Sequence, residues 1–431
     1  GGLFDAIGRA RQRYVGLLNP DGSADSGFTP SSSIHGPVYA IERQPNGKFL
    51  LGGYSGFVFG SDSQYKGLWR INADGSLDTT LRTQIGNFES INTVALQSNG
   101  KILVGGAFTT INGVSSHRLA RLNSDGSLDT SFVPEISELR VYKIAIQNDG
   151  KILVGGTLGY QGGSQNIVRL NEDGSVDPSF NVGAGANGTV SAIYLDPTGR
   201  IYVGGEFFAF NGFSLRYVAR LNSNGSVDSS FRSPGVAAAV NSISELPSGK
   251  ILIGGKVFAA VDATPRVGVL RLLESGLVDY SFEVSALSNP SGSQEVLQIG
   301  ALPDGKVLAV GQFESISGVS RNAIARFLPA PRITRPAFDF DSDGRADISV
   351  FRPSTGTWYR LNSNNNSFRA FSFGLSGDRI VPADFDGDYL ADIAIFRPSE
   401  GTWYKLKTQG FIFETFHFGL PNDRPITGDF D

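Results

Sequence analysis

The sequence predicts an all-β fold built as a β-propeller, and three observations lead to this prediction. A unit of about 50 residues recurs six times, no stretch of the repeats shows helical periodicity, and glycine accounts for 55 of the 431 residues. Glycine at this frequency, without the three-residue period of collagen, indicates many tight turns. Short strands and tight turns in a repeated unit of this length are typical of a propeller.

Two sequence signatures mark each unit. The first reads GKILVGG or a close variant, and the second reads LNSDGSLD or a close variant. In the third unit we expect strands at Val141–Gln147, Lys151–Thr157, Asn166–Asn171 and Ser175–Phe180. The NDG and EDG turns between these strands supply the glycine that tight hairpins need. The basic residues of the first signature are Lys48, Lys101, Lys151, Arg200, Lys250 and Lys306.

The number of predicted strands favours six blades, with seven as the alternative. Six whole units of four strands run from about Ala24 to Phe327, within a propeller that we place at residues 13–328. One further strand, Arg13 to Asn19, precedes them and could close the ring by pairing with the last blade. Residues 1–12 form a separate N-terminal segment.

A second array follows the propeller. Three prolines in residues 329–337 predict a linker, because proline cannot continue a sheet in its interior. Residues 338–431 then repeat with a period of about 45 residues, and the final GDFD begins a third copy. Two complete copies are too few to close a ring. The chain also opens with Gly-Gly and contains no methionine, so we expect it to be part of a longer polypeptide.

Both arrays are similar to known repeat families. The pattern GKILVGG…ARLNSDGSLDTSF resembles the delta-sixty repeat family, found in bacterial secreted and surface proteins, over about residues 13–327. The sixth unit departs from the pattern because no DGS follows its NAIARFL. The pattern DFDSDGRADISVFRPSTGTWYRL resembles the FG-GAP, integrin-alpha-like repeat over about residues 337–431. That resemblance implies blades that bind calcium.

The aspartate-rich loops of the second array are the candidate metal sites. Carboxylates at positions 1, 3, 5 and 9 and a main-chain carbonyl at position 7 offer the oxygen ligands that Ca²⁺ prefers. In the first loop these ligands are Asp339, Asp341, Asp343, Asp347 and the carbonyl of Arg345. In the second they are Asp384, Asp386, Asp388, Asp392 and the carbonyl of Leu390, and a third loop begins with Asp429 and Asp431. Tyr389 replaces the glycine found at Gly344, so we expect the second loop to bind more weakly or with backbone strain.

The remaining polar motifs are given structural interpretations. The DGS turns are polar hairpin turns, and GAGANG at residues 183–188 matches a dinucleotide motif by accident, because a strand follows it. His35, His117 and His417 share no motif. An arginine and an aspartate recur in the blades and should form one ion pair per blade: Arg70, Arg121, Arg169, Arg220, Arg271 and Arg326, with Asp78, Asp129, Asp177, Asp228 and Asp279.

Composition narrows the classes of function. There is no cysteine, so disulfides, thiolate metal sites and a cysteine nucleophile are excluded. A formal net charge of −4 does not indicate a nucleic-acid binder, and no apolar run is long enough to span a membrane.

Because the polar residues repeat with the blades, we expect a non-enzymatic protein. We expect it to be extracellular or at the cell surface, with calcium as cofactor and a protein, a glycan or copies of itself as partner. A secreted propeller enzyme acting on polysaccharide is the alternative. An asymmetric polar cluster in the channel would favour that alternative.

Overall fold

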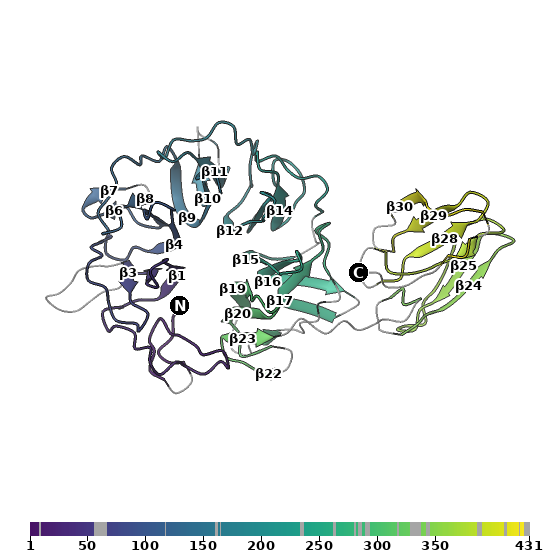
Figure 1. The fold of residues 1–431 in the computed structure, drawn as a ribbon, viewed down its shortest axis with the longest axis horizontal. Coiled ribbons are helices and arrows are strands. Elements are labelled where there is room, and N and C mark those ends of the chain that lie inside the picture. Colours follow the sequence, from purple (N-terminus) through teal and green to yellow (C-terminus); the bar gives the residue numbers. More distant parts are fainter. Residues whose placement is uncertain are drawn as a thin grey trace.

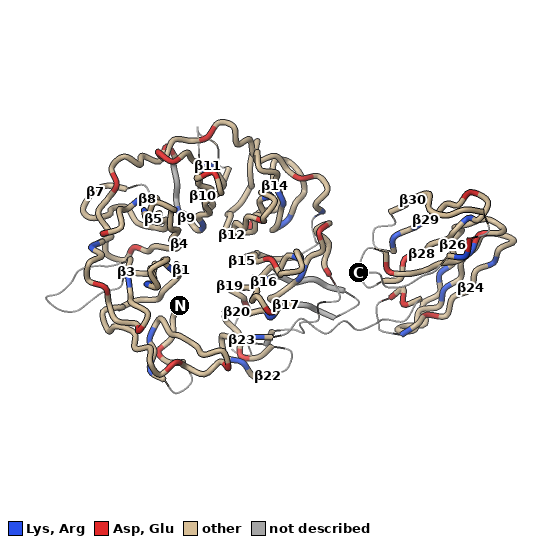
Figure 2. Tube along the Cα trace, viewed as in Figure 1, with Lys and Arg blue, Asp and Glu red and all other residues tan. Residues whose placement is uncertain are grey.

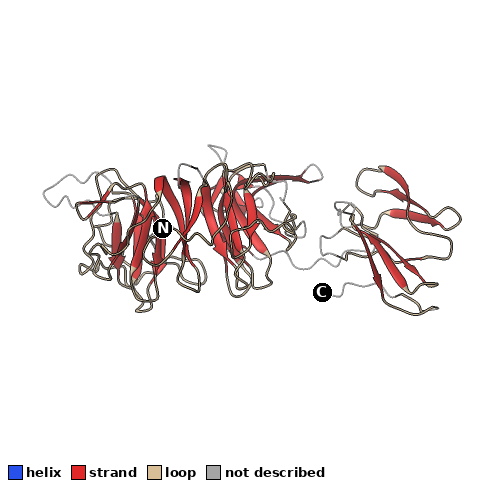
Figure 3. Ribbon diagram, turned by 90° about the horizontal axis from the view of Figure 1, so that it is seen from above, coloured by secondary structure: helices blue, strands red, loops and turns tan. Residues whose placement is uncertain are grey.

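The chain folds into strands and turns, and the part described here contains no helix (Figure 3). This computed structural model describes residues 1–7, 10–55, 67–116, 118–159, 163, 165–232, 237–261, 264–279, 282, 287–288, 294–316, 319–327, 338–341, 345–385, 390–408, 412–421 and 423–425. The predicted linker at residues 329–337 lies outside the described residues. No helix in the described residues is long and apolar enough to cross a membrane.

Six antiparallel sheets stand in a ring, each with three strands in chain order (Figure 1). The first three sheets are β1 (Val38–Arg43), β2 (Phe49–Gly53) and β3 (Leu68–Ile71); β4 (Ile91–Leu96), β5 (Ile102–Gly106) and β8 (Leu119–Leu122); and β9 (Ser137–Ile146), β10 (Ile152–Gly159) and β11 (Ile167–Leu170). The next three are β12 (Val190–Leu195), β13 (Ile201–Gly205) and β14 (Val218–Leu221); β15 (Val240–Glu245), β16 (Ile251–Val261) and β17 (Thr264–Leu272); and β19 (Glu295–Ala301), β20 (Val307–Gln312) and β23 (Ile324–Phe327). Two small sheets accompany them. One has two strands, β6 (Thr110–Ile111) and β7 (Val114–Ser115), and the other has three, in the order β18 (Leu287–Ser288), β21 (Ser315–Ile316) and β22 (Val319–Ser320).

The predicted fourth strand of each unit is much shorter than expected. In the third unit it is a single bridge between Leu170 and Val176, where we expected a strand over Ser175–Phe180. The reason is local, because the amide of Ser179 donates to the carboxylate of Asp177 (3.0 Å) and is not offered to the sheet. The same bridge follows β3, β8, β14 and β17, so the DGS hairpin belongs to the blade that precedes it.

The paired glycines of the first signature allow adjacent blades to approach closely. β1, β4, β9, β12, β15 and β19 lie nearest the ring axis (Figure 1). A Cβ atom on Gly105 of β5 would lie 2.4 Å from Cγ1 of Val141 on β9, and one on Gly204 would lie 2.6 Å from Cγ1 of Val240. Real Cβ atoms do not approach so closely, so this position requires glycine. In the sixth blade the same register position is Val310.

Residues before β1 occupy a seventh position in the ring. The segments GGLF and YVGLLNPDGSADSGF have the same sequence pattern as the second half of the repeated unit. A Cβ on Gly1 would lie 2.6 Å from Cγ1 of Val38, which is the same approach that Gly204 makes to Val240. The amide of Val38 also donates to the carbonyl of Gly2 (3.4 Å), so residues ahead of the expected boundary at residue 13 contact the first blade.

The ring closes through this segment by a different contact from the strand pairing that we expected. In the described residues, Arg13–Asn19 is not a strand and its one bridge joins Leu18 to Ala24, which forms its own DGS hairpin. Arg326 of the sixth blade donates to the carbonyl of Pro20 in that hairpin. The same N-terminal segment also contacts the first blade, because Val15, Phe28 and Ile34 pack against side chains of β1, β2 and β3.

The second array contains two sheets. The first holds β24 (Ile348–Arg352), β25 (Thr357–Leu361) and β26 (Phe368–Ser372), and the second holds β27 (Arg379–Ile380), β28 (Ile393–Arg397), β29 (Thr402–Leu406) and β30 (Phe413–His417). The sheets pack face to face, with Phe340 and Trp358 of the first repeat against Ile393 and Ile395 of the second. The start of the predicted third copy, residues 426–431, lies outside the described residues.

Candidate functional site

The two aspartate loops lead directly into the first long strand of each repeat. Residues 339–347 precede β24, and residues 384–392 precede β28. The carbonyl of Asp339 accepts a hydrogen bond from the amide of Ala391 (2.7 Å), so the first loop is tied to the second. The start of the first loop and the end of the second therefore meet between the two repeats.

The position-9 aspartates fasten the loops to the rest of each repeat. In the first loop, the carboxylate of Asp347 accepts from the amides of Phe340 (2.9 Å) and Ser363 (2.8 Å). In the second, Asp392 accepts from the amides of Phe385 (3.1 Å) and Thr408 (2.7 Å). Both aspartates are buried. The sequence pattern predicted these aspartates only as ligands, and the structure adds a second role, in which each one ties the ends of its loop together.

The remaining predicted ligands are described in part. Asp339 is buried, and Asp341 is half-buried and accepts from the amide of Asn364 (3.3 Å). Asp384, Arg345 and Leu390 are also described, but Asp343, Asp386, Asp388, Asp429 and Asp431 lie outside the described residues, as do Gly344 and Tyr389. Within the described ranges, no three acidic or histidine side chains are arranged to hold a metal. The donor set of carboxylates and carbonyls nevertheless has the chemistry that suits a hard cation such as Ca²⁺.

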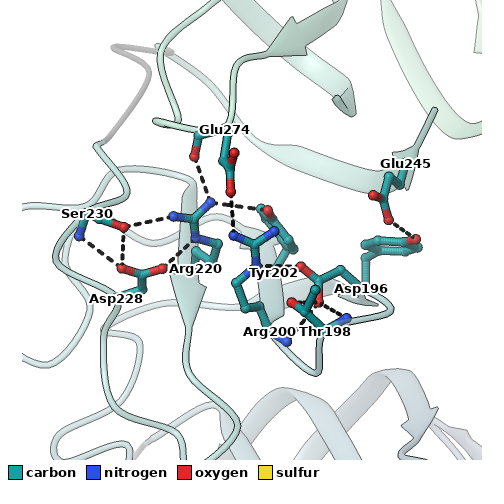
Figure 4. A network of polar contacts seen from close by, with 10 residues as sticks. Asp196, Thr198, Arg200, Tyr202, Arg220, Asp228, Ser230, Glu245 and Glu274 are labelled. Carbon is teal, nitrogen blue, oxygen red and sulfur yellow. Dashed lines mark hydrogen bonds and ion pairs between the residues drawn. The ribbon is translucent and has the colours of Figure 1, made fainter. Parts of the chain in front are cut away.

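A second polar site recurs in the propeller and is built around a buried arginine. In the fourth blade, Nε of Arg220 donates to Asp228 (2.7 Å) and Nη2 donates to Ser230 (3.0 Å) (Figure 4). Nη1 donates to the main-chain carbonyl of Glu274, in the DGS-type turn of the next blade (2.7 Å). The guanidinium also lies over the ring of Phe231, at 4.9 Å from the centroid. One side chain therefore joins its own hairpin to the neighbouring blade.

The predicted arginine–aspartate pairs are confirmed in five blades. The pairs are Arg70–Asp78, Arg121–Asp129, Arg169–Asp177, Arg220–Asp228 and Arg271–Asp279, with N–O distances of 2.6–2.8 Å. The link to the next blade also recurs, from Arg70 to Ser124, from Arg121 to Glu172 and from Arg169 to Ser223. The motif ARLNSDGSLDTSF thus encodes both the pair and the contact between blades.

The lysine of the first signature adds a second cation to four of these aspartates. The pairs are Lys48–Asp78, Lys101–Asp129, Lys151–Asp177 and Lys250–Asp279. In the fourth blade, Arg200 binds Asp196 (2.6 Å) and Glu274 (2.9 Å) instead, as Figure 4 shows. These basic residues were predicted only as markers of the repeat, although their nearly constant spacing from the aspartate could have indicated the ion pair.

The environment of these aspartates lowers their pKa. Burial alone would raise the pKa of Asp129, but hydrogen bonds from Lys101, Ser131 and Arg121 outweigh it and hold the pKa well below its usual range. Asp78 and Asp177 show the same shift for the same reasons. The carboxylates are therefore committed to holding the blades and are not poised as acids or bases near neutral pH.

The strands nearest the axis carry polar residues that do not repeat. Burial raises the pKa of Glu42 on β1 against the attraction of Lys143 on β9, and burial lowers the pKa of Lys143 against the attraction of Glu42. Tyr194 on β12 donates to Glu245 on β15 (2.7 Å). Positions of Lys and Arg and of Asp and Glu alternate around the described part of the ring (Figure 2). The channel side of the propeller is therefore asymmetric.

The other candidate motifs fall in unrelated places. His35 and His417 are exposed and far apart in the chain, and His117 lies outside the described residues. Gly183–Gly188 leads into β12, so the dinucleotide-like motif is followed by a strand, as predicted.

Family models match both arrays. A model described as a domain of unknown function (DUF5122) beta-propeller matches residues 44–81, 97–132, 147–180, 197–231, 246–282 and 302–330. A model described as an FG-GAP-like repeat matches residues 339–431. No curated protein matches the chain.

Solved structures are similar at low identity. The extracellular domain of a putative one-component system from B. thetaiotaomicron is 13% identical, with a TM-score of 0.45, and the match covers 94% of this chain and 50% of that one. PorZ, a surface component of the type-IX secretion system of Porphyromonas gingivalis, is 12% identical, with a TM-score of 0.40, and the match covers 93% of this chain and 56% of that one. A glucose dehydrogenase is 13% identical, with a TM-score of 0.33, and the match covers 63% of this chain and 92% of that one. This chain thus spans about half the length of the first two, and at these scores none of the three indicates a function.

The lowered aspartate pKa values predict how stability depends on acidity. A carboxylate whose pKa is depressed on folding contributes stability that is complete above the unfolded pKa of about 3.9 and is lost as the pH falls through the folded value. The thermal midpoint of the propeller should therefore change little between about pH 7 and 5 and fall below about pH 4. Thermal unfolding followed by circular dichroism measures this, with Asp129→Asn as the control that lowers stability at neutral pH. A steep loss already between pH 7 and 5 contradicts the assignment.

Proposed function

The chain belongs to the DUF5122 β-propeller family and carries FG-GAP-like repeats, and from this premise we propose a non-enzymatic binding or structural protein at the cell surface or outside the cell. The observation that carries the proposal is how the repeated polar groups are used. In five blades the arginine binds the aspartate, and in four of these the arginine also donates to a main-chain carbonyl of the next blade. The groups that recur are therefore occupied in assembling a rigid ring.

We further propose that the aspartate loops bind Ca²⁺ and stabilise the second array. Asp339, Asp341 and the main chain of Arg345 would contribute ligands in the first loop, together with Asp343 and Asp347. Asp347 and Asp392 support this because each accepts a hydrogen bond from an amide at the start of its own loop, Phe340 or Phe385, which ties the two ends of the loop together. A bound cation would offset the repulsion between carboxylates, which is about 4 kcal/mol for two unit charges 4 Å apart at an effective dielectric near 20. Calcium modules outside cells bind at about 10⁻⁴ to 10⁻³ M, which suits an extracellular location.

A secreted enzyme acting on polysaccharide is the second candidate, and the asymmetric channel favours it. Glu42 of the first blade and Lys143 of the third attract each other electrostatically. Burial raises the pKa of Glu42 and lowers the pKa of Lys143, so both values move toward neutral pH. A pair of this kind on the axis side of a propeller has the composition of a general acid–base site.

Removal of calcium should loosen the second array and leave the first propeller intact. A ligand present at ten times its Kd stabilises the folded form by about 1.4 kcal/mol per site. Limited proteolysis with and without EGTA should therefore show faster cleavage within residues 338–431 after chelation. Asp341→Ala should reproduce part of the effect, whereas Asp74→Ala, in an exposed propeller turn, should not. Equal cleavage rates with and without EGTA would show that the loops are ordinary acidic turns.

The two candidate functions make opposite predictions about turnover. A binding or structural protein should release no product from common polysaccharides, as measured by chromatography of the digests. A reproducible product that disappears in Glu42→Gln overturns the proposal in favour of the enzyme. Glu172→Gln, on an exposed propeller turn, is the matched control for the substitution itself.

A further inference from the structure

A cavity of about 550 Å³ lies in the segment before β1, which occupies the seventh position of the ring (Figure 1). One wall is a hairpin closed by the bridge between Ile7 and Ala10, called the N-terminal hairpin below, and the other is the connection that leads into β1. The polar side chains that line the cavity are Asp5, Arg11, Arg13, Ser31, Ser32 and His35. The volume falls in the range of about 300–1,000 Å³ that is usual for ligand sites.

Both walls of the cavity are held by hydrogen bonds. Gln12 is buried and holds the N-terminal hairpin, since its Nε2 donates to the carbonyls of Asp25 (2.9 Å) and Phe28 (3.1 Å). The connection is held by the first blade, because the amide of Ser31 donates to the carbonyl of Gly75 (3.1 Å). The cavity is therefore preformed, and a ligand can bind without first ordering its walls.

The fourth blade contains a hairpin with the same backbone as the N-terminal hairpin. The amide of Tyr14 donates to the carbonyl of Phe4 (2.9 Å). In the same way, the amide of Tyr217 donates to the carbonyl of Phe207 (2.8 Å). Both tyrosines have a positive φ, 64° and 65°. The fourth blade therefore shows how this hairpin behaves when blades flank it on both sides.

The side of the hairpin that carries the cavity residues is open in the fourth blade as well. The residues at the places of Asp5, Arg11 and Arg13 are exposed there: Phe208, Ser214 and Arg216. The accessibility of this side therefore follows from the place of the hairpin in a blade.

The polar side chains of the cavity depart from the repeat. In the fourth blade, the rings of Phe208 and Tyr217 are in edge-to-face contact at 5.4 Å. At the seventh position Asp5 takes the place of Phe208 and pairs with Arg13 (2.8 Å), whose guanidinium lies over the ring of Tyr14 at 5.5 Å. The backbone of the hairpin forms with either set of side chains, so the polar set is not required for the fold and indicates a separate role.

The cavity carries an excess of positive charge. Asp5 neutralises Arg13, whereas the side chain of Arg11 has no ion pair or hydrogen bond within the described part of the chain. A guanidinium in this situation can bind a carboxylate through two parallel N–H···O bonds. The hydroxyl groups of Ser31 and Ser32 supply further donors and acceptors in the same cavity. A carboxylate next to several hydroxyl groups is the chemistry of an acidic sugar.

We propose that this cavity binds a uronic acid residue of a polysaccharide, with the sugar carboxylate on Arg11 and its hydroxyl groups on Ser31 and Ser32. An inorganic anion would leave most of the cavity to water, whereas a sugar ring can reach both walls. The inference rests on the proposed binding function and names the class of its ligand. An acidic peptide is the alternative ligand, and it lacks the ring hydroxyls that the two serines would bind.

Isothermal titration calorimetry of the full chain with a trisaccharide of galacturonic acid, at a fixed Ca²⁺ concentration, tests the proposal. The trisaccharide should bind, and its neutral methyl ester should bind at least about tenfold more weakly because Arg11 loses its charged partner. Arg11→Gln should weaken binding of the acid by a similar factor. Arg216→Gln removes the same charge from the equivalent hairpin of the fourth blade and should bind like the wild type.

A second substitution blocks the cavity independently. Ser32→Asp adds a negative charge to the lining and should also abolish binding, and circular dichroism confirms that each variant is folded. No binding of the trisaccharide, equal binding of its methyl ester, or unchanged binding by Arg11→Gln overturns the proposal. Triglutamate that binds as tightly as the trisaccharide also overturns it, in favour of an acidic peptide.

Failure of this proposal and failure of the proposed function give different results. If the trisaccharide does not bind, the non-enzymatic function still stands, because only turnover of a polysaccharide contradicts that function. Chromatography of the titrated mixture shows whether the trisaccharide remains intact. Cleavage contradicts the non-enzymatic function, whereas the dependence of binding on Arg11 tests the cavity alone.

Discussion

The propeller depends on a buried arginine in each of its first five blades, and in four of them this side chain is seen to bind in two directions at once. Its Nε and Nη2 hold the aspartate and hydroxyl of its own hairpin, and in four blades its Nη1 is seen to reach a main-chain carbonyl of the next blade. An unpaired charge buried at such a point would cost several kcal/mol, so the pair and the carbonyl must both be present. The planar guanidinium of arginine has several N–H donors in fixed directions, so it can bind both groups at once. The ammonium group of lysine is a single compact charge and could not make the same contacts.

The exceptions to this pattern show where the ring is not a simple repetition. In the fourth blade Arg200 binds Asp196 and Glu274, and among the described residues Asp228 is paired with Arg220 alone. In the sixth blade Val310 replaces the glycine that elsewhere admits the next inner strand. Arg326 nevertheless reaches Pro20, so the contact between blades survives at the closure of the ring. The interaction is therefore kept even where the packing changes.

Much of this architecture could be predicted from the sequence, because each feature is local. The hairpins follow from glycines at fixed places, and the arginine–aspartate pair follows from residues eight positions apart across one turn. The reduction of the fourth strand was missed because a carboxylate competes with the sheet for an amide, which strand patterns do not show. The bond from Arg169 to Ser223 joins residues 54 positions apart, and only the geometry of the ring brings them together.

In the candidate metal loops, too, one feature could be predicted from the sequence and another could not. Their ligand spacing is a local signal, whereas the use of Asp347 by the amides of Phe340 and Ser363 depends on how β24 and β25 are folded together. The seventh ring position had a signal that was overlooked, since GGLF repeats the GGAF and GGEF of later units. The close approach of Gly1 to Val38 gives that pattern its physical meaning.

Substitution of one buried arginine tests the central claim most directly. Arg169→Gln removes the cation that binds Asp177 and the donor that reaches Ser223, whereas Arg232→Gln changes an exposed side chain. The account predicts that Arg169→Gln lowers the free energy of unfolding by about 3 kcal/mol. It also predicts faster amide hydrogen exchange in the turn at residues 222–226 of the next blade. If Arg169→Gln unfolds and exchanges like Arg232→Gln, the arginine does not hold adjacent blades together and the account is contradicted.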